Sequence, residues 1–437
     1  MTRLLTASLL VLALFASRSH AQEGNKPPKG FTAIFNGKNL KGWHGMGHFD
    51  PRKLKAMTPA ERTAKRLKDL DDVHKHWFVR DGELINDGHG VFLTTDKEYG
   101  DFEMWIDYKT VPKADSGIYL RFNPQIQIWD YTKAGGKWNI GADKGSGGMW
   151  NNSKGAAGKD PLVLADKPFG QWNRFRIRQV GARTTVHLNN KLVVDHATME
   201  NFWDRSKPLF RKGGIQLQTH GGEIRWRNVF IREIPPSEAN AILNSKSNKG
   251  FKSVFNGVNL DGWKGDTKNY VVNEGAIMCK KGHGGNLYTA NAYSDFVARL
   301  EFQLPPGGNN GLAIRYSGKG NPAYDAMCEL QVLDSEHPKY AKLDKRQYHG
   351  SAYGISAAHR GFLRKTGEWN FQEVTVKGST IKVELNGFVI LNTDVAKVTK
   401  YMANSPHPGK NRKSGYFGFA GHNDPVKFRN IQIKTLK

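Results

Sequence analysis

The sequence contains only two cysteines, Cys279 and Cys328, among 437 residues. Two thiols exclude a cysteine-ligated metal cluster and allow one disulfide bond, which the sequence alone does not establish. Beyond the first 21 residues, no apolar run approaches the roughly 18 residues that a membrane-spanning helix needs. Acidic residues are scarce, since 40 Asp and Glu stand against 65 Lys and Arg and give a formal net charge of +25. We therefore expect a basic protein with no membrane span.

An excess of positive charge is compatible with nucleic acid, with acidic polymers or simply with solubility. The basic residues are scattered along the chain, and no zinc-finger, helix-turn-helix or RNA-recognition signature occurs. We therefore expect no nucleic-acid partner. The usual spacings of metal-binding histidines and carboxylates are also absent. We expect neither a tightly bound metal ion nor another cofactor.

The first 21 residues have the pattern of a secretory signal peptide. Arg3 precedes an apolar run over residues 4–16, and the small residues Ser19 and Ala21 precede the expected cleavage point. The run is too short for a membrane span, and no nearby cysteine could accept a lipid anchor. The sequence predicts a secreted or periplasmic protein.

The chain contains one long internal repeat. Short motifs return in the same order about 200 residues later, which indicates duplication of a whole domain. We expect a first domain over residues 27–234, a linker over residues 235–250 and a second domain over residues 251–437. The matched segments begin at Phe31 and Phe251, Tyr99 and Tyr293, Ser116 and Asn310, Ile126 and Leu330, Trp172 and Trp369, and Arg227 and Arg429.

Each copy has the pattern of many short strands. Residues 299–304, 373–377 and 381–385 alternate polar and apolar side chains, and Asn386-Gly387 is a strong hairpin signal. The exception is residues 51–75, where Thr58, Pro59 and Glu61 have the pattern of a helix N-terminus. The sequence predicts an all-β protein of two sandwiches or jelly rolls in tandem, with a helical insert in the first.

Several motifs, taken together, resemble the 3-keto-disaccharide hydrolase domain family. They are Asn-Gly-x-Asn-Leu-x-Gly-Trp, Tyr-x-Asp-Phe, Gly-Ile-Tyr-Leu-Arg, a Gln-x-Gln strand, Trp-Asn and a closing Phe-Arg-Asn-Ile. The resemblance covers both copies, over about residues 30–234 and 251–437. It implies a concanavalin A-like jelly roll, export in bacteria, and action on carbohydrate substrates oxidised at the sugar C3. A sugar 3-dehydrogenase acting upstream would supply such substrates.

The chemistry of such a substrate defines the residue types that a site needs. A ketone at C3 acidifies the proton at C2, which a general base can remove while an acid protonates the leaving oxygen at C1. Elimination followed by addition of water gives net hydrolysis. The sequence leaves the sugar, the linkage and the choice between elimination and direct hydrolysis open.

Candidate site residues lie at matching positions of the two copies. Glu329 and Gln331 alternate with aliphatic residues, so we expect both to face a binding surface and Glu329 to act as the base. Gln125 takes the place of Glu329 in the first copy, which favours the second copy as the catalyst. The predicted catalytic residues are Glu329, His422, His220, Asp130 and Asp334. The predicted substrate-binding residues are Arg121, Gln125, Gln127, Trp129, Arg315, Gln331, Glu301 and Asp107.

Two alternatives stay open at this point. In the first, the candidate residues have structural roles. Arg121 and Arg315 could form ion pairs with Asp107 and Glu301, and Gln127 and Gln331 could simply face solvent. His220 and His422 could be ordinary loop residues, and the tryptophans could belong to the core. A non-catalytic, lectin-like protein is also compatible with the sequence, because tandem copies give avidity for a polysaccharide. A retaining glycosidase of the laminarinase type is disfavoured, because neither copy has Glu-x-Asp-x-x-Glu on one strand.

Overall fold

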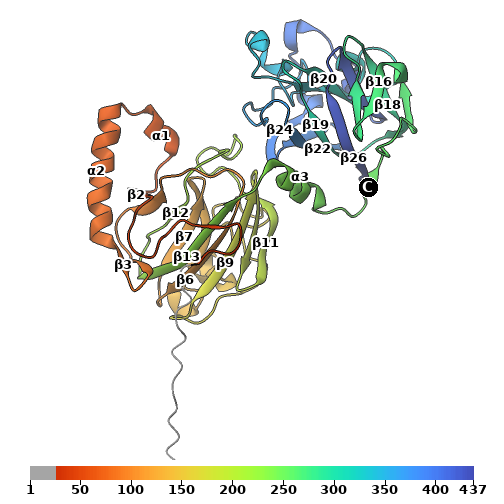
Figure 1. Ribbon diagram of the computed structural model, residues 1–437. Helices are drawn as coiled ribbons and strands as arrows, with labels where there is room; N and C mark the ends of the chain where they lie inside the picture. The colour runs from red at the N-terminus through yellow and green to blue at the C-terminus, as the bar shows by residue number, and fades with distance from the viewer. Residues whose placement is uncertain (1–25) are drawn as a thin grey trace, which may run out of the picture.

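The computed structural model describes residues 26–437 and has two β-sandwich domains with a short helix between them (Figure 1). Each domain pairs an eight-stranded sheet with a five-stranded sheet, and neighbouring strands run antiparallel. The predicted all-β fold of two concanavalin A-like jelly rolls in tandem is confirmed. The predicted signal peptide, residues 1–21, lies outside the described residues. Among the described residues, no helix has the length and apolarity to cross a membrane.

The first domain closes its two sheets around one hydrophobic core. Ile126 and Ile128 of the smaller sheet and Ile106 and Phe175 of the larger one are fully buried in it. The eight-stranded sheet contains β1 (Thr32–Ala33), β3 (Trp77–Arg80), β4 (Glu83–Asn86), β6 (Phe102–Thr110), β9 (Asn173–Val180), β10 (Arg183–Leu188), β11 (Lys191–Thr198) and β13 (Ile224–Glu233). The five-stranded sheet, in the order β2-β5-β12-β7-β8, contains β2 (Trp43–Met46), β5 (Phe92–Thr95), β7 (Asp115–Leu120), β8 (Asn123–Trp129) and β12 (Gln216–Leu217).

The second domain repeats this arrangement. Its eight-stranded sheet contains β14 (Lys252–Ser253), β16 (Tyr270–Asn273), β17 (Ala276–Cys279), β19 (Phe296–Gln303), β22 (Trp369–Lys377), β23 (Thr380–Leu385), β24 (Phe388–Asp394) and β26 (Lys427–Thr435). Its five-stranded sheet contains β15 (Trp263–Gly265), β18 (Gly284–Tyr293), β20 (Asn309–Tyr316), β21 (Cys328–Leu333) and β25 (Gly415–His422). Cys279 and Cys328 lie on different sheets, and both are buried free thiols.

The helical insert of the first domain consists of α1 (Pro51–Ala56) and α2 (Pro59–His76). Thr58 caps α2 as the sequence predicts, and its hydroxyl and Glu61 form a reciprocal capping box. Val73 of α2 is buried, and the helix packs against β2 on the flank of the domain (Figure 1). In the second domain a single-turn helix, α4 (Pro322–Asp325), lies elsewhere, next to β21.

Short 3₁₀ turns complete the connections. In the first domain they are η1 (Lys133–Gly135), η2 (Trp138–Ile140) and η3 (Ala142–Lys144). In the second domain they are η4 (Thr267–Asn269), η5 (Pro338–Tyr340), η6 (Lys345–Gln347), η7 (Val395–Lys397), η8 (Met402–Asn404) and η9 (Pro408–Asn411).

Hydrogen bonds join the repeated Arg motif to the Tyr-x-Asp-Phe motif inside each domain, and we call this contact the arginine lock. The buried Arg121 guanidinium donates to the Gly100 carbonyl at 2.9 Å and to Asp101 at 3.2 Å. Asp101 in turn accepts from the Gly181 amide of the β9–β10 turn at 2.8 Å. The predicted substrate role of Arg121 is therefore replaced by a structural one, and its partner is Asp101 rather than Asp107.

Arg315 repeats this lock in the second domain. It donates to the Ser294 carbonyl and to Asp295, each at 2.7 Å, and Asp295 accepts from the Gly378 amide at 3.0 Å. Arg315 is also buried, so it does not face a binding surface. Its predicted substrate role is corrected for the same reason, and its partner is Asp295 rather than Glu301.

Asp107 and Glu301 lie on the eight-stranded sheets, whereas the cavity described below lies on a five-stranded sheet. Asp107 accepts from the Arg174 guanidinium at 2.6 Å and from Asn228 at 2.8 Å. Glu301 accepts from Arg429 at 2.8 Å, as part of the equivalent cluster. Asn228 sits at a break in the β6–β13 register with a φ of 51°. Each carboxylate therefore stabilises a β-bulge in its own domain, and this structural role replaces the predicted role in substrate binding.

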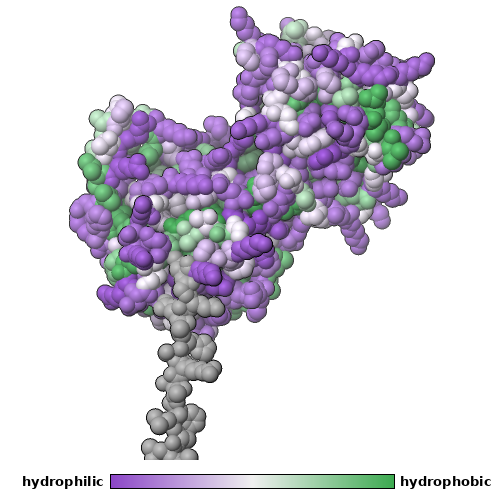
Figure 2. Space-filling model, viewed as in Figure 1, coloured by the Kyte–Doolittle hydropathy of each residue, from purple (hydrophilic) through white to green (hydrophobic). Residues whose placement is uncertain are grey.

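The segment expected as a linker, residues 235–250, contains a helix, α3 (Pro236–Ser245). Its Ala239 and Leu243, four residues apart, pack with Val180 of the first domain and Phe371 of the second. Helix α3 therefore belongs to the interface between the domains (Figure 1). Figure 2 shows that the viewed surface of both domains is mostly hydrophilic.

Candidate functional site

A cavity of about 640 Å³ lies on the outer face of the five-stranded sheet of the first domain. Side chains alternate along β7 and β8, so Ile118, Ile126 and Ile128 enter the core while their neighbours face the cavity. Loops after β2, after β8 and before β13 complete the wall. The lining residues are His48, Phe92, Asp115, Tyr119, Gln125, Gln127, Trp129, Lys137, Ile140, Trp150, Asn151, Phe202, Gln218 and His220.

Asp115 is the charged centre of this cavity. Its carboxylate accepts from His220 Nδ1 at 3.0 Å, from Gln127 Nε2 at 2.8 Å and from the Lys137 ammonium. Burial acts to raise the pKa of Asp115, but the hydrogen bonds from His220 and Lys137 outweigh it, so the pKa is lowered. Asp115 therefore stays ionised and fixes the orientation of His220.

The two histidines of the cavity have pKa values shifted in opposite directions. The hydrogen bond to Asp115 raises the pKa of His220, which favours its protonated form. Burial lowers the pKa of His48, and the nearby charge of His220 lowers it further. His48 Nδ1 lies 2.8 Å from the Tyr119 hydroxyl, which orients the ring. A neutral base and a protonated acid can therefore coexist in one cavity near neutral pH.

Three amide oxygens of the cavity are buried without a hydrogen-bond partner. They belong to Gln125, Gln218 and Asn151. A buried acceptor without a partner costs free energy, so these oxygens are poised for donors that a ligand brings, such as sugar hydroxyls. Gly117 makes room for two of them, because a Cβ there would lie 2.7 Å from Gln125 Oε1 and 3.0 Å from Gln218 Oε1.

Aromatic rings form the apolar part of the wall. Trp129 and Trp150 meet edge to face with ring centroids 6.1 Å apart, and Trp129 Nε1 donates to the Gly145 carbonyl at 2.9 Å. Phe92 and Phe202 also line the cavity. A sugar ring presents a C–H face and an edge of hydroxyls. The aromatic rings can pack against the C–H face, and the unpaired amide oxygens can accept hydrogen bonds from the hydroxyls. Trp129, predicted from the sequence, thus lines the cavity while being mostly buried.

The equivalent positions of the second domain carry different chemistry. Glu329 is buried over Gly311, and His422 Nε2 lies 3.9 Å from Glu329 Oε1, so the two predicted catalytic residues are neighbours. Gln331 donates to Asn309 at 2.6 Å. Asn309 replaces the ionised Asp115 of the first domain. The structure thus brings Glu329, Gln331 and His422 together. The catalytic role of Glu329 and His422 and the substrate-binding role of Gln331 stay predictions.

Asp130 and Asp334 hold turns in the structure. Asp130 accepts from the amides of Lys113 and Thr132, each at 2.8 Å. Asp334 accepts from the Gly307 amide at 2.9 Å. Asp130 does not line the cavity of its own domain, so we correct its predicted catalytic role to one in turn formation. Asp334 makes a similar turn contact in the second domain, and its catalytic role stays a prediction.

Of the predicted residues, the structure brings Gln125, Gln127, Trp129 and His220 to the cavity. Sequence reasoning missed several others. Tyr119 stood inside a matched segment and Asp115 directly before it, where the second copy has Ala313 and Asn309. That difference between aligned copies was an available signal. Other missed residues lie mostly in loops or short strands without a recognisable pattern: His48, Phe92, Lys137, Asn151, Phe202 and Gln218.

The fold and the cavity together define a class, the concanavalin A-like sandwich with a polar, aromatic-walled site on one sheet. Residues 30–232 and 250–434 match one family, described as the 3-keto-alpha-glucoside-1,2-lyase-like domain. The chain belongs to this family and carries two copies of its domain. A relative from Bacteroides thetaiotaomicron, named 3-keto-disaccharide hydrolase, is 26% identical over 267 residues, which cover 52% of this chain and 91% of that relative. The match supports a glycosidase-like function.

Solved structures from two bacteria are also similar. A protein of Parabacteroides distasonis named as a glycosyl hydrolase is 24% identical, covers 43% of this chain and 99% of its own, and has a TM-score of 0.39. A carbohydrate-binding module of Bacillus subtilis is 11% identical, covers 40% of this chain and 96% of its own, and has a TM-score of 0.28. At these scores the fold assignment rests on the strand order of this chain itself.

Proposed function

We propose that the first domain cleaves glycosides that carry a ketone at C3, by elimination and subsequent addition of water. The observation that carries the proposal is the pair His48 and His220, whose pKa values are shifted apart in one cavity. The family and the named relative support the substrate class. The choice of the first domain departs from the sequence-based preference for the second.

His48 is the proposed general base. Its pKa is lowered, so the neutral ring is available near neutral pH, and its Nε2 has no hydrogen-bond partner within residues 26–437. It takes the proton from C2, and the electron pair of that C–H bond moves toward the C3 ketone to form an enolate. Lys137 and the Tyr119 hydroxyl line the same cavity and can stabilise the enolate oxygen.

His220 is the proposed general acid. Its proton goes to the departing oxygen as the C1–O bond breaks and a C1–C2 double bond forms. A water molecule then adds its hydroxyl to C1 and a proton returns to C2, so the overall reaction is hydrolysis. Asp115 does not exchange protons in this scheme, because it stays ionised and stabilises the charged imidazole of His220.

The test is release of sugar from a 3-keto-glucoside by the full chain. His48→Ala and His220→Ala should each lower kcat/KM by about 100-fold or more, the usual contribution of a positioned acid or base. Glu329→Gln, at the equivalent site of the second domain, is the matched control and should retain turnover. Loss of turnover in Glu329→Gln alone would move the active site to the second domain.

A lectin-like function is the second candidate, favoured by the tandem copies and the unpaired amides. It predicts binding of sugars with no turnover of any 3-keto-glycoside. If the histidine variants bind a 3-keto-glucoside as the parent does and neither parent nor variants release sugar, the lectin function replaces the enzymatic one.

We also propose that the protein is exported, since residues 1–21 have a signal-peptide pattern. Fractionation with an antibody to the mature chain tests this, and a cytoplasmic protein that keeps its first 21 residues would contradict it. The substrate would come from a reaction that oxidises the C3 hydroxyl of a glycoside, the activity of a sugar 3-dehydrogenase.

A further inference from the structure

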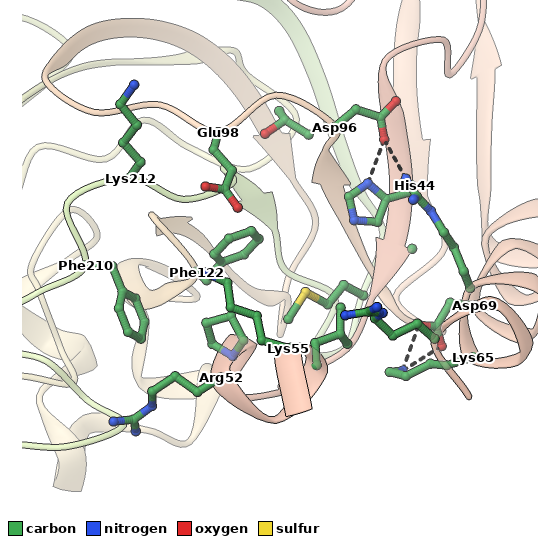
Figure 3. A pocket seen from close by; sticks show the side chains of 17 residues that line it. His44, Arg52, Lys55, Lys65, Asp69, Asp96, Glu98, Phe122, Phe210 and Lys212 are labelled. Carbon is green, nitrogen blue, oxygen red and sulfur yellow. Dashed lines mark hydrogen bonds and ion pairs between the residues drawn. The ribbon is translucent and has the colours of Figure 1, made fainter. Parts of the chain in front are cut away.

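A second pocket of about 310 Å³ lies between the helical insert and the first sandwich. Met46 of β2 and Leu54 of α1 contribute to its apolar surface, together with Phe122 and Phe210. Figure 3 shows the two phenylalanines at one end, near Arg52 and Lys212. The insert builds one wall of this pocket, and the second domain has no comparable insert. The volume is within the range of pockets that hold small ligands.

The charged residues of this pocket are mostly basic. Of its three acids, Asp69 is paired with Lys65 at 2.7 Å, and Asp96 is bonded to His44 at 2.7 Å (Figure 3). Glu98 has no ion-pair partner among the described residues. The six basic residues that line the pocket are Arg52, Lys55, Arg62, Lys65, Arg66 and Lys212.

Three of these cations have no ion pair or hydrogen bond from their side chains within residues 26–437: Lys55, Arg62 and Lys212. One unpaired carboxylate, that of Glu98, stands against them. An anion entering the pocket would therefore meet an excess of positive charge around an apolar floor. Arg and Lys are the side chains that bind carboxylate, sulfate and phosphate oxygens.

Phe122 is held toward this pocket in a strained conformation. It has a φ of 62° and follows Arg121, whose φ is 57°, in the two-residue turn between β7 and β8. Bulky residues rarely adopt this left-handed conformation, and such strain clusters at functional sites. The Arg121 lock holds the turn, and the missing side chain of Gly214 leaves room for the Phe122 ring. In the second domain, Arg315 shares this conformation but the next residue, Tyr316, does not.

The second pocket adjoins the aromatic cavity. Met46 lines the pocket and His48 lines the cavity, and two residues of extended chain separate Cα atoms by at most about 7 Å. Arg52 donates to the Trp203 carbonyl at 3.1 Å, and the Trp203 ring packs on His48 with centroids 4.8 Å apart. One short segment of chain thus contributes to both walls, which places the two sites side by side.

We propose that the pocket under the helical insert binds a negatively charged sugar unit, carboxylated or sulfated, of the substrate that enters the aromatic cavity. The proposal rests on the proposed function for the identity of that substrate. Lys55, Arg62 and Lys212 bind the anionic group, while Phe122 and Phe210 contact the sugar ring. The site selects acidic over neutral oligosaccharides and takes no part in the bond cleavage.

Calorimetry on the full chain at low salt tests the proposal with four probes: glucuronic acid, glucose 6-sulfate, glucose and inorganic sulfate. We expect one or both acidic sugars to bind and glucose to bind at least about tenfold more weakly. The triple variant Lys55→Ala, Arg62→Ala, Lys212→Ala should weaken the acidic sugar at least about tenfold. A charge-matched control, Lys249→Ala, Lys365→Ala, Lys377→Ala, removes three exposed lysines elsewhere and should change nothing.

Turnover of a neutral 3-keto-glucoside separates this inference from the proposed function. The triple variant should keep that turnover, because none of its residues lines the aromatic cavity. Equal binding of glucose and the acidic sugars, or binding of inorganic sulfate as tight as that of glucose 6-sulfate, would overturn the proposal. Absence of turnover in the parent, with acidic-sugar binding lost in the triple variant, would refute the proposed function and retain the anionic-sugar site.

Discussion

At the residue scale, a match between the two copies marks residues of the fold and of the site alike, since Arg121 matches Arg315 and His220 matches His422. Arg121 and Arg315 make the same buried lock in each domain. Asp115 and Tyr119 of the cavity correspond to Asn309 and Ala313. A repeated motif therefore identifies the family but does not by itself identify the active site. This is why the sequence predicted the fold well and the site only in part.

The opposite pKa shifts of the two histidines predict a bell-shaped pH profile of kcat/KM. Activity should rise as His48 loses its proton below pH 6.5 and fall as His220 loses its proton above pH 6.5. In Asp115→Asn the falling limb should move to lower pH, because the carboxylate that raises the pKa of His220 is gone. Asp143→Asn, an exposed control, should keep the parent profile. An unmoved falling limb in Asp115→Asn would refute the assignment of His220.

The buried Arg121 predicts a loss of stability without a specific loss of substrate binding. Arg121→Leu removes the partner of Asp101 and of the Gly100 carbonyl, and should lower the free energy of unfolding by about 3 kcal/mol. Urea unfolding measures this. Lys97→Ala, which breaks an exposed ion pair with Glu233, should cost less than about 1 kcal/mol. A stable Arg121→Leu protein with a raised KM would restore the substrate role predicted from the sequence.

At the scale of elements, the sequence predicted the features that depend on neighbouring residues, which are helix caps and hairpin turns. The Thr58 cap and the Asn386-Gly387 turn depend on residues next to each other in the chain, and the structure has both, with Asn386 at a φ of 50°. The cavity depends on loops distant in sequence that close over one sheet. His48 and Lys137 lie in such loops, and no periodicity marks them. Their convergence is a product of tertiary packing, so the sequence pattern did not reveal it.

The capping box of α2 predicts a local effect. Thr58→Ala removes a hydroxyl that accepts from the Glu61 amide, and should destabilise the insert by about 1 kcal/mol. Hydrogen exchange of the α2 amides should accelerate about fivefold, while strand amides of the core stay protected. Thr58→Ser should keep the parent rates, because serine caps as well. Equal exchange rates in Thr58→Ala would show that packing on β2 alone maintains the helix.

At the scale of the whole molecule, the two domains meet through hairpin turns and α3. The Ala182 amide donates to the Gly387 carbonyl at 2.9 Å, and Arg183 forms a largely buried ion pair with Glu384. A Cβ on Gly181 would lie 2.3 Å from the Asn386 carbonyl oxygen, so the close approach of the two turns requires glycine there. The composition of residues 235–250 suggested only a linker, because a helix this short gains its stability from the surfaces on which it packs.

The Arg183–Glu384 pair should couple the domains energetically. A double-mutant cycle with Arg183→Met and Glu384→Met, measured on the free energy of unfolding, should give a coupling of about 1–3 kcal/mol. The pair Lys397–Asp394, whose lysine is exposed, is the control and should couple by less than about 0.5 kcal/mol. A coupling near zero for Arg183 and Glu384 would mean that the domains unfold independently of this contact.

Gly117 has a consequence for how the protein can be used. Any side chain at this position would displace the unpaired amide oxygens of Gln125 and Gln218. The hydrophobic core on the other side of the strand would not change. Gly117→Ala should therefore yield a folded chain whose first domain no longer binds sugars. With this variant, the sugars that the second domain binds can be identified on a glycan array without a contribution from the first domain.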